Sequence, residues 1–316
     1  SVIPARSKAT LLDEMAMALN ECINIYGKTI KRLGKINRIT ACFWPVRLVP
    51  LNDTRACVCS YLLNKQEKLN VGKFSQTPPS PDNIIQGADL ILVDINEELL
   101  NETCKKIEQE YKQKVIPIVC DVSKSEQVQD MAKRAFKELD NIYVLNNNAG
   151  IGDIYGPDLL RIKEDLFDRI ISVNLRGQWL VSKYVSKKMK SQKFENEPLS
   201  GKVIHTASIA GMVVDIKLSA YTLSKVGVIA MVKMLAQSLA PKITVNAISP
   251  GFHVTGIYNY SENAMKTTMD DGHVKTPLNR IGTVQDVANV SVFLASPLSN
   301  FITGHNIPLL LPSQSL

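Results

Sequence analysis

Long apolar runs, clustered cysteines and a glycine-rich turn near the start are what this 316-residue sequence lacks. Without a run of about 18 consecutive apolar residues, no membrane-spanning helix is expected. Asp13 and Glu14 interrupt the region where a secretory signal needs an apolar segment, so we expect a cytoplasmic protein. Cys57 and Cys59 are separated by one residue and lie far from the nearest histidine, His205, so we expect reduced thiols and no metal site.

Charge is distributed unevenly along the chain. Of its 37 basic and 30 acidic residues, 12 and 6 lie in residues 1–86, which leaves 25 and 24 for residues 87–316. Such a change in net charge favours two segments of different origin. Pro78, Pro79 and Pro81 exclude a helix where the two segments join. The basic first segment has no motif of interleaved aromatic and basic residues, so we expect no nucleic-acid partner and assign it no function.

The second segment alternates short apolar runs with amphipathic stretches, whereas the first does not continue this rhythm. Because apolar runs separated by helices are typical of a sheet covered on both faces, the pattern predicts an α/β protein with a doubly wound parallel sheet. Strands are predicted at 88–94, 115–119, 142–145, 202–205 and 243–248, and helices at 97–112, 124–139, 163–191 and 219–239.

Tyr221 and Lys225 lie at the start of the helix predicted over 219–239. Their four-residue spacing places both side chains on one helix face. A nearby ammonium lowers the pKa of tyrosine from its reference of about 10, which makes the phenol a usable general acid and base. The spacing alone is weak, because the same pattern begins at Tyr61 and at Tyr184.

Ser208 distinguishes this pair from the other two. It lies thirteen residues before Tyr221 and just after the strand predicted over 202–205, whereas the same offset gives Leu48 and Ile171 for the other pairs. A serine hydroxyl can hold a substrate carbonyl while Tyr221 donates its proton. A turn or helix cap is the alternative role for Ser208.

Taken in order, these and three further motifs resemble those of the short-chain dehydrogenase/reductase family over about residues 88–308. The further motifs are Asn147-Asn148-Ala149-Gly150 after a strand, Asn174 in Ser172-Val173-Asn174-Leu175, and Pro250-Gly251-Phe252-His253-Val254-Thr255. Residues 277–296 match the family's C-terminal helix pattern. The resemblance is strongest to 3-oxoacyl-carrier-protein reductases and to the sugar and alcohol dehydrogenases around them.

The resemblance implies a Rossmann-like fold and an oxidoreductase that interconverts an alcohol and a ketone or aldehyde with NAD(H). Tyr221 would be the acid/base, while Lys225 would lower its pKa and hold the nicotinamide ribose. Ser208 would orient the carbonyl, and Asn174 would hold a water that links Lys225 to solvent. A homodimer or homotetramer is implied as well. Cofactor contacts would fall on Asp94, Asp121, Val122, Asn148, Ala149, Gly150, Tyr221, Lys225, Pro250, Gly251, Val254 and Thr255.

Asp94 ends the first strand predicted in the second segment. An acid there can accept hydrogen bonds from both hydroxyls of the adenosine ribose and would repel a 2′-phosphate, which favours NAD over NADP. A cap for the following helix is the alternative role, and the two are compatible.

The family's first strand, Thr-Gly-x-x-x-Gly-x-Gly turn and helix are absent from the sequence. Gly27, Gly34, Gly72 and Gly87 are the only glycines before residue 88, and no three have that spacing. The turn normally offers backbone N–H groups to the pyrophosphate at a helix N-terminus. We therefore interpret residues 1–86 as foreign to the family. The alternative to an active oxidoreductase is a catalytically impaired or chimeric relative that acts as a non-catalytic binding or assembly protein. The family's C-terminal Val-Asp-Gly-Gly is also replaced, by Leu309-Leu310-Leu311-Pro312.

Overall fold

The structure is a computed structural model. It describes residues 89–111, 114–152, 158–194, 197–214, 218–253 and 276–309. All features expected in residues 1–86, and the expected cofactor contacts Val254 and Thr255, lie outside these ranges.

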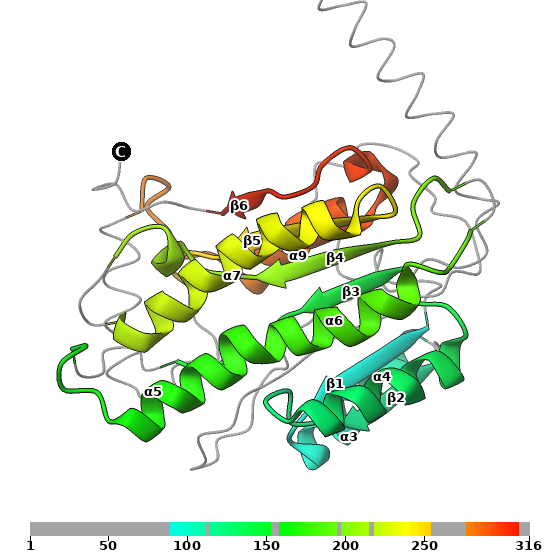
Figure 1. Cartoon of the computed structure of the whole chain (residues 1–316), viewed down its shortest axis with the longest axis horizontal. Coiled ribbons are helices and arrows are strands. Elements are labelled where there is room, and N and C mark those ends of the chain that lie inside the picture. The colour runs from blue at the N-terminus through cyan, green and yellow to red at the C-terminus, as the bar shows by residue number, and fades with distance from the viewer. Residues whose placement is uncertain are drawn as a thin grey trace, which may run out of the picture.

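All strands of the described ranges pair in parallel, in a sheet of two strands and a sheet of four (Figure 1). The smaller sheet consists of β1 (Leu90–Asp94) and β2 (Val115–Val119). The larger sheet has the order β3 (Val144–Asn147), β4 (Gly201–Thr206), β5 (Ile243–Ser249) and β6 (Asn306–Pro308).

Helices connect these strands, at bounds close to the predicted ones. The helix predicted over 163–191 is interrupted, since a π-helical turn at Ser172–Gly177 separates two α-helices. The α-helices are α3 (Glu97–Tyr111), α4 (Ser125–Leu139), α5 (Glu164–Ile171), α6 (Gln178–Met189), α7 (Ser219–Leu239) and α9 (Val284–Ala295).

Two hydrophobic cores lie on opposite faces of the strands. Successive side chains of a strand point to opposite faces, so Ile91 and Val93 of β1 join one core while Leu90 and Leu92 join the other. The first core also contains side chains of α4, α6 and α7, and the second contains side chains of α3 and α9. Helices therefore cover both faces, and the prediction of a doubly wound parallel α/β fold is confirmed.

Strands β1 and β3 share these cores although they belong to different sheets. Leu92 of β1 and Val144 of β3 lie in one core cluster, yet within the described ranges no backbone hydrogen bond joins the two strands. The resemblance implies a sheet whose central first strand is replaced here by residues 1–86, which lie outside the described ranges.

Helix α7 is apolar and is the one helix of the described ranges long enough to cross a membrane by length and composition. It is not an uninterrupted apolar run, because Lys225 and Lys233 lie within it. However, 56% of its apolar window is buried in the protein. Its apolar composition reflects a central position, where Val228 and Val232 pack in the core and Tyr221 and Lys225 are held inside the protein.

Candidate active site

Tyr221 and Lys225 lie one turn apart near the start of α7. Both are buried, and Nζ of Lys225 lies 5.4 Å from the centroid of the Tyr221 ring. The ammonium donates a hydrogen bond to the carbonyl oxygen of Thr206 at 2.8 Å, at the carboxyl end of β4. The predicted spacing thus places a cation directly beside the phenol.

Burial determines the proton affinity of Lys225. Removal from water disfavours the charged amine and lowers the pKa of Lys225 to about 7. A lysine with such a pKa changes charge near neutrality. Its influence on Tyr221 therefore varies with pH in the range where an acid/base group has to operate.

Ser208 follows β4 and caps the short 3₁₀ turn Ile209–Gly211. Its Oγ accepts a hydrogen bond from the Ala210 N–H at 3.2 Å, so the alternative role as a cap is real. A hydroxyl that accepts one bond can still donate its own proton to a substrate oxygen. A Cβ on Gly211 would lie 2.8 Å from the backbone carbon of Lys225, so glycine is needed where this turn approaches α7.

Asn174 lies in the π-helical turn and is fully buried. Its Oδ1 accepts from the Ile151 N–H at 2.8 Å, and its Nδ2 donates to the Ile151 carbonyl at 2.8 Å and to Oγ of Ser224 at 3.1 Å. The side chain thereby joins the loop after β3 to α7. π-Helical turns inside helices occur frequently at functional sites.

Gly150 brings these groups together. A Cβ on Gly150 would lie 3.5 Å from Oδ1 of Asn174 and 3.6 Å from Nζ of Lys225. Asn174 and Lys225 thus face the same point of the loop after β3, beside the start of α7. The structure gathers the catalytic residues suggested by the sequence at the carboxyl ends of β3 and β4, where ligands bind in open α/β sheets.

The candidate adenosine residues lie at the carboxyl ends of β1 and β2. Asp94 is buried, and its Oδ1 accepts from the Asn96 N–H at 2.8 Å. Asn96 in turn caps α3, because its Oδ1 accepts from the Leu99 N–H at 3.1 Å. Asp94 therefore stabilises the turn between β1 and α3. The helix cap, which was the alternative role for Asp94, is instead Asn96.

Asp121 and Val122 form the turn after β2. Oδ1 of Asp121 accepts from the N–H and the hydroxyl of Ser123, at 2.9 and 2.7 Å. Val122 is buried, and a Cβ on Gly177 would lie 2.8 Å from its Cγ2. The close approach presses this turn against the π-helical turn that carries Asn174.

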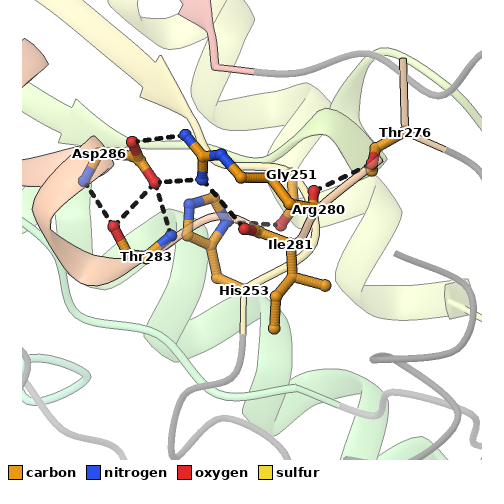
Figure 2. A network of polar contacts seen from close by, with 7 residues as sticks. All are labelled: Gly251, His253, Thr276, Arg280, Ile281, Thr283 and Asp286. Atoms are coloured by element: carbon orange, nitrogen blue, oxygen red, sulfur yellow. Dashed lines mark hydrogen bonds and ion pairs between the residues drawn. The ribbon is translucent and has the colours of Figure 1, made fainter. Parts of the chain in front are cut away.

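The Pro250–Gly251 turn follows β5, and the Phe252 carbonyl accepts a hydrogen bond at 2.8 Å from the Gly282 N–H, just before α9. Nδ1 of His253 pairs with the Gly251 carbonyl at 3.0 Å. Figure 2 shows Arg280 and Thr283 converging on Asp286, and two hydrogen bonds from Arg280, at 2.8 and 3.0 Å, hold the pKa of the Asp286 carboxyl well below its ordinary value. Asn148 and Ala149 lie in the loop after β3, as the sequence indicated.

Comparisons with known proteins identify the family of this chain. A family model described as enoyl-(acyl carrier protein) reductase matches residues 84–309. A 3-oxoacyl-(acyl-carrier-protein) reductase of Thermotoga maritima is 34% identical over 224 residues, which cover 70% of this chain and 86% of that protein. The chain belongs to the short-chain dehydrogenase/reductase family. It is accordingly an oxidoreductase that acts on CH–OH groups.

Solved structures of the short-chain dehydrogenase/reductase fold are also similar. An NAD⁺-bound xylitol dehydrogenase is 28% identical with a TM-score of 0.61, and the match covers 70% of this chain and 87% of that one. A levodione reductase is 29% identical with a TM-score of 0.64, over 70% of this chain and 86% of that one.

Three buried polar residues beneath this short-chain dehydrogenase/reductase site were not singled out from the sequence. Gln178, Ser182 and His205 are fully buried and bonded to one another or to the loop after β3. Two signals point to them in retrospect. His205 stands in an otherwise apolar strand, and Gln178 and Ser182 are four residues apart on one helix face.

Proposed function

We propose that this protein is an NAD(H)-dependent oxidoreductase that interconverts an alcohol and a ketone or aldehyde, with Tyr221 as acid/base. The observation that carries the proposal is the buried ammonium of Lys225 beside the Tyr221 ring, held by the Thr206 carbonyl. A buried cation next to a phenol favours the phenolate and thus eases proton exchange with a substrate oxygen.

Four residues form the proposed catalytic tetrad, and each has a distinct role: Asn174, Ser208, Tyr221 and Lys225. Tyr221 gives its phenolic proton to the carbonyl oxygen during reduction and takes it back during oxidation. Ser208 donates a hydrogen bond to the same oxygen and orients it. Asn174 holds the loop after β3 and a water between itself and Lys225, which returns the proton to Tyr221. The nicotinamide supplies or accepts the hydride, and the protein supplies geometry.

The described residues fit the two ends of the dinucleotide. At the nicotinamide end, the Lys225 amine proposed to hold the ribose lies beside Gly150, whose lack of a side chain leaves room for the water between Lys225 and Asn174. At the adenosine end, Asp94 presents a carboxylate at the end of β1, which supports NAD over NADP. The pyrophosphate between them lacks its glycine turn in the sequence, so we propose weak binding of NAD by the intact chain.

The substrate class is proposed from the relatives. Their names cover a 3-oxoacyl thioester, xylitol and levodione, all of which carry a secondary alcohol or ketone. We therefore propose a 3-oxoacyl, sugar or alcohol substrate. An assay with one 3-oxoacyl thioester and one polyol distinguishes the two classes.

We also propose a homodimer or homotetramer in the cytoplasm. Trp179, Leu223, Val226 and Met234 expose apolar side chains on α6 and α7, as surfaces between subunits often do. Cys120 is a buried free thiol, which is typical of a reducing compartment. Light scattering of the purified protein tests the assembly, and a monomer at micromolar concentration contradicts it.

The central test compares Tyr221→Phe with Tyr184→Phe. Tyr184 belongs to a second Tyr-x-x-x-Lys pair, on α6, so the control removes the same atom at a pair of equal spacing. At NADH concentrations high enough to offset the weak binding proposed above, we expect NADH fluorescence on binding in all three proteins, with turnover lost only in Tyr221→Phe. Turnover like that of the unchanged chain in Tyr221→Phe would refute the assignment. No NADH signal in any variant would favour the non-catalytic alternative, which the comparisons do not support.

A further inference from the structure

A buried chain of hydrogen bonds lies next to the tetrad. It contains no tetrad residue and meets the tetrad only at the Thr206 carbonyl, which also accepts from Lys225. Nδ2 of Asn147 contacts Oγ of Ser182 at 3.0 Å, and the Ser182 oxygen contacts Nε2 of His205 at 3.1 Å. Nδ1 of His205 contacts Oε1 of Gln178 at 2.8 Å. All four side chains are fully buried, so each bond lies in a medium of low dielectric where it is strong.

The direction of this chain follows from its final acceptors. Nε2 of Gln178 lies 3.2 Å from the Ala149 carbonyl and 3.3 Å from the Thr206 carbonyl, and only an N–H can satisfy two carbonyl oxygens. Oε1 therefore faces His205, whose Nδ1 has to carry the proton. Nε2 of His205 is then the acceptor for the Ser182 hydroxyl. Burial, followed by the charge of Lys225, lowers the pKa of His205 to about 3, which keeps the ring neutral.

The Thr206 carbonyl is where this chain meets the tetrad. Strand β3 pairs with β4 only as far as Asn147 and His205, so Thr206 lies one residue beyond that ladder. Its oxygen accepts from both Gln178 and Lys225. A change in the Gln178 amide thus acts on the oxygen that holds the Lys225 ammonium.

We propose that Gln178, oriented by His205, is a positioning residue for Lys225 and acts through the Thr206 carbonyl that both side chains share. The inference rests on the proposed function for the importance of Lys225. It adds a second layer beneath the site, which sets where the amine lies and how readily it binds a proton. Through the Ala149 carbonyl the same amide holds the loop that carries Gly150.

The test measures proton binding by Lys225 in the full chain without cofactor. Lysine is labelled with ¹³C at Cε, and the Lys225 signal is assigned by its loss in Lys225→Met. We expect Gln178→Met to raise the titration midpoint of Lys225 by about one pH unit, because the Thr206 oxygen is then left to the ammonium alone. His205→Phe should raise it by less, since the Gln178 amide remains but loses its orientation.

Ser186→Ala is the matched control. Ser186 lies one turn after Ser182 on α6 and is buried, but its hydroxyl has no hydrogen-bond partner among the described residues. Its removal should leave the midpoint unchanged, whereas Ser182→Ala should raise it slightly. Ser182→Ala also carries the test if Gln178→Met does not fold.

Two results would overturn the proposal. One is a Lys225 midpoint that is the same in the unchanged chain and in folded Gln178→Met, His205→Phe and Ser182→Ala. The other is an equal shift in Ser186→Ala, which would indicate general loosening of the core. Because no cofactor or substrate is present, an inactive enzyme with shifted midpoints refutes the proposed function and supports this inference, and an active enzyme with fixed midpoints does the reverse.

Discussion

The two sheets of this protein differ in how they are built and in what they carry. The four-stranded sheet carries Ser208 and the Thr206 carbonyl at its carboxyl edge, and hydrogen bonds connect it to the helices that bear Asn174 and Lys225. The two-stranded sheet carries Asp94 and Asp121 and shares both apolar cores, but no ladder joins it to the larger sheet within the described residues. The residues proposed for acid/base chemistry therefore lie on one sheet and its helices, whereas the proposed dinucleotide contacts fall on both sheets.

The largest effect should come from restoring the family's first strand, glycine turn and helix, which the sequence lacks. Replacement of residues 1–86 by a strand, glycine turn and helix of the family pattern would return two or three charge-assisted hydrogen bonds to the pyrophosphate. At about 1.5–3 kcal/mol each, they should tighten NADH binding by roughly two to six orders of magnitude. Fluorescence titration of both proteins measures the change. Micromolar binding by the original chain with no gain in the graft would show that residues 1–86 already provide a phosphate site.

A second experiment tests the cost of a buried charge in the four-stranded sheet. Lys202 is buried on β4 with Ser299 as its hydrogen-bond partner, and burial lowers its pKa to about 8. Below pH 8 the amine is charged in both folded and unfolded chains, and the full burial cost is present. Between about pH 8 and 10.5 the unfolded chain binds more protons, so stability rises with pH in this window. We expect Lys202→Met to raise the free energy of unfolding by about 3 kcal/mol at pH 7.

Urea unfolding at pH 7 and pH 10 measures that gain. It should shrink at the higher pH, because the unchanged protein has by then released the Lys202 proton. A gain of equal size at both pH values would mean that packing, and not charge, is what the methionine improves.

A third experiment changes the contact between Val122, in the turn after β2 of the two-stranded sheet, and Gly177, in the π-helical turn before α6. A Cβ on Gly177 would lie 2.8 Å from Cγ2 of Val122, and valine is stiff about χ1. Gly177→Ala should therefore lower the free energy of unfolding by about 1–3 kcal/mol, as overpacking usually does. Val122→Ala in the same chain should restore part of the loss.

Gly150→Ala is the matched control for this substitution. Its added methyl group would meet Asn174 and Lys225 at ordinary contact distances of 3.5 and 3.6 Å, so stability should hardly change. Turnover should fall, since the methyl group fills the space proposed for a water. Equal losses of stability in both alanine variants would contradict the close contact at Val122.

The smallest effect concerns cofactor choice in the two-stranded sheet. Asp94→Ala removes a carboxylate that would accept bonds from the ribose and repel a 2′-phosphate. The preference for NADH over NADPH should narrow by about tenfold, which corresponds to about 1.4 kcal/mol. Binding titrations with both nucleotides measure the ratio. A native preference for NADPH would contradict the role proposed for Asp94.

The sequence alone predicted the alternation of strands and helices, with small shifts at the ends. Helix α7 occupies the predicted residues, because its apolar pattern and its length are local properties. Strand β3 begins two residues later than predicted, at Val144, because Ile142 and Tyr143 are apolar residues buried beside the strand and not part of it. Composition cannot distinguish a buried strand residue from a buried neighbour.

The π-helical turn at Asn174 could not be predicted from local pattern. Residues 163–191 have continuous helical periodicity, but the backbone widens at Ser172–Gly177, where the Asn174 amide reaches the loop after β3. Such a turn depends on a partner from elsewhere in the chain. No window of the sequence around Asn174 contains that partner.

What the sequence by itself determined is the identity and spacing of the chemistry. Tyr221 and Lys225 share a helix face because four residues make about one helical turn, and Ser208 follows a strand because the apolar run ends before it. What only the tertiary structure decided is the acceptor of Lys225, the burial that lowers its pKa, and the polar chain from Asn147 to Gln178 beneath it. These features depend on where β4 extends past β3, and the end of one strand relative to another is determined by contacts between residues far apart in the chain.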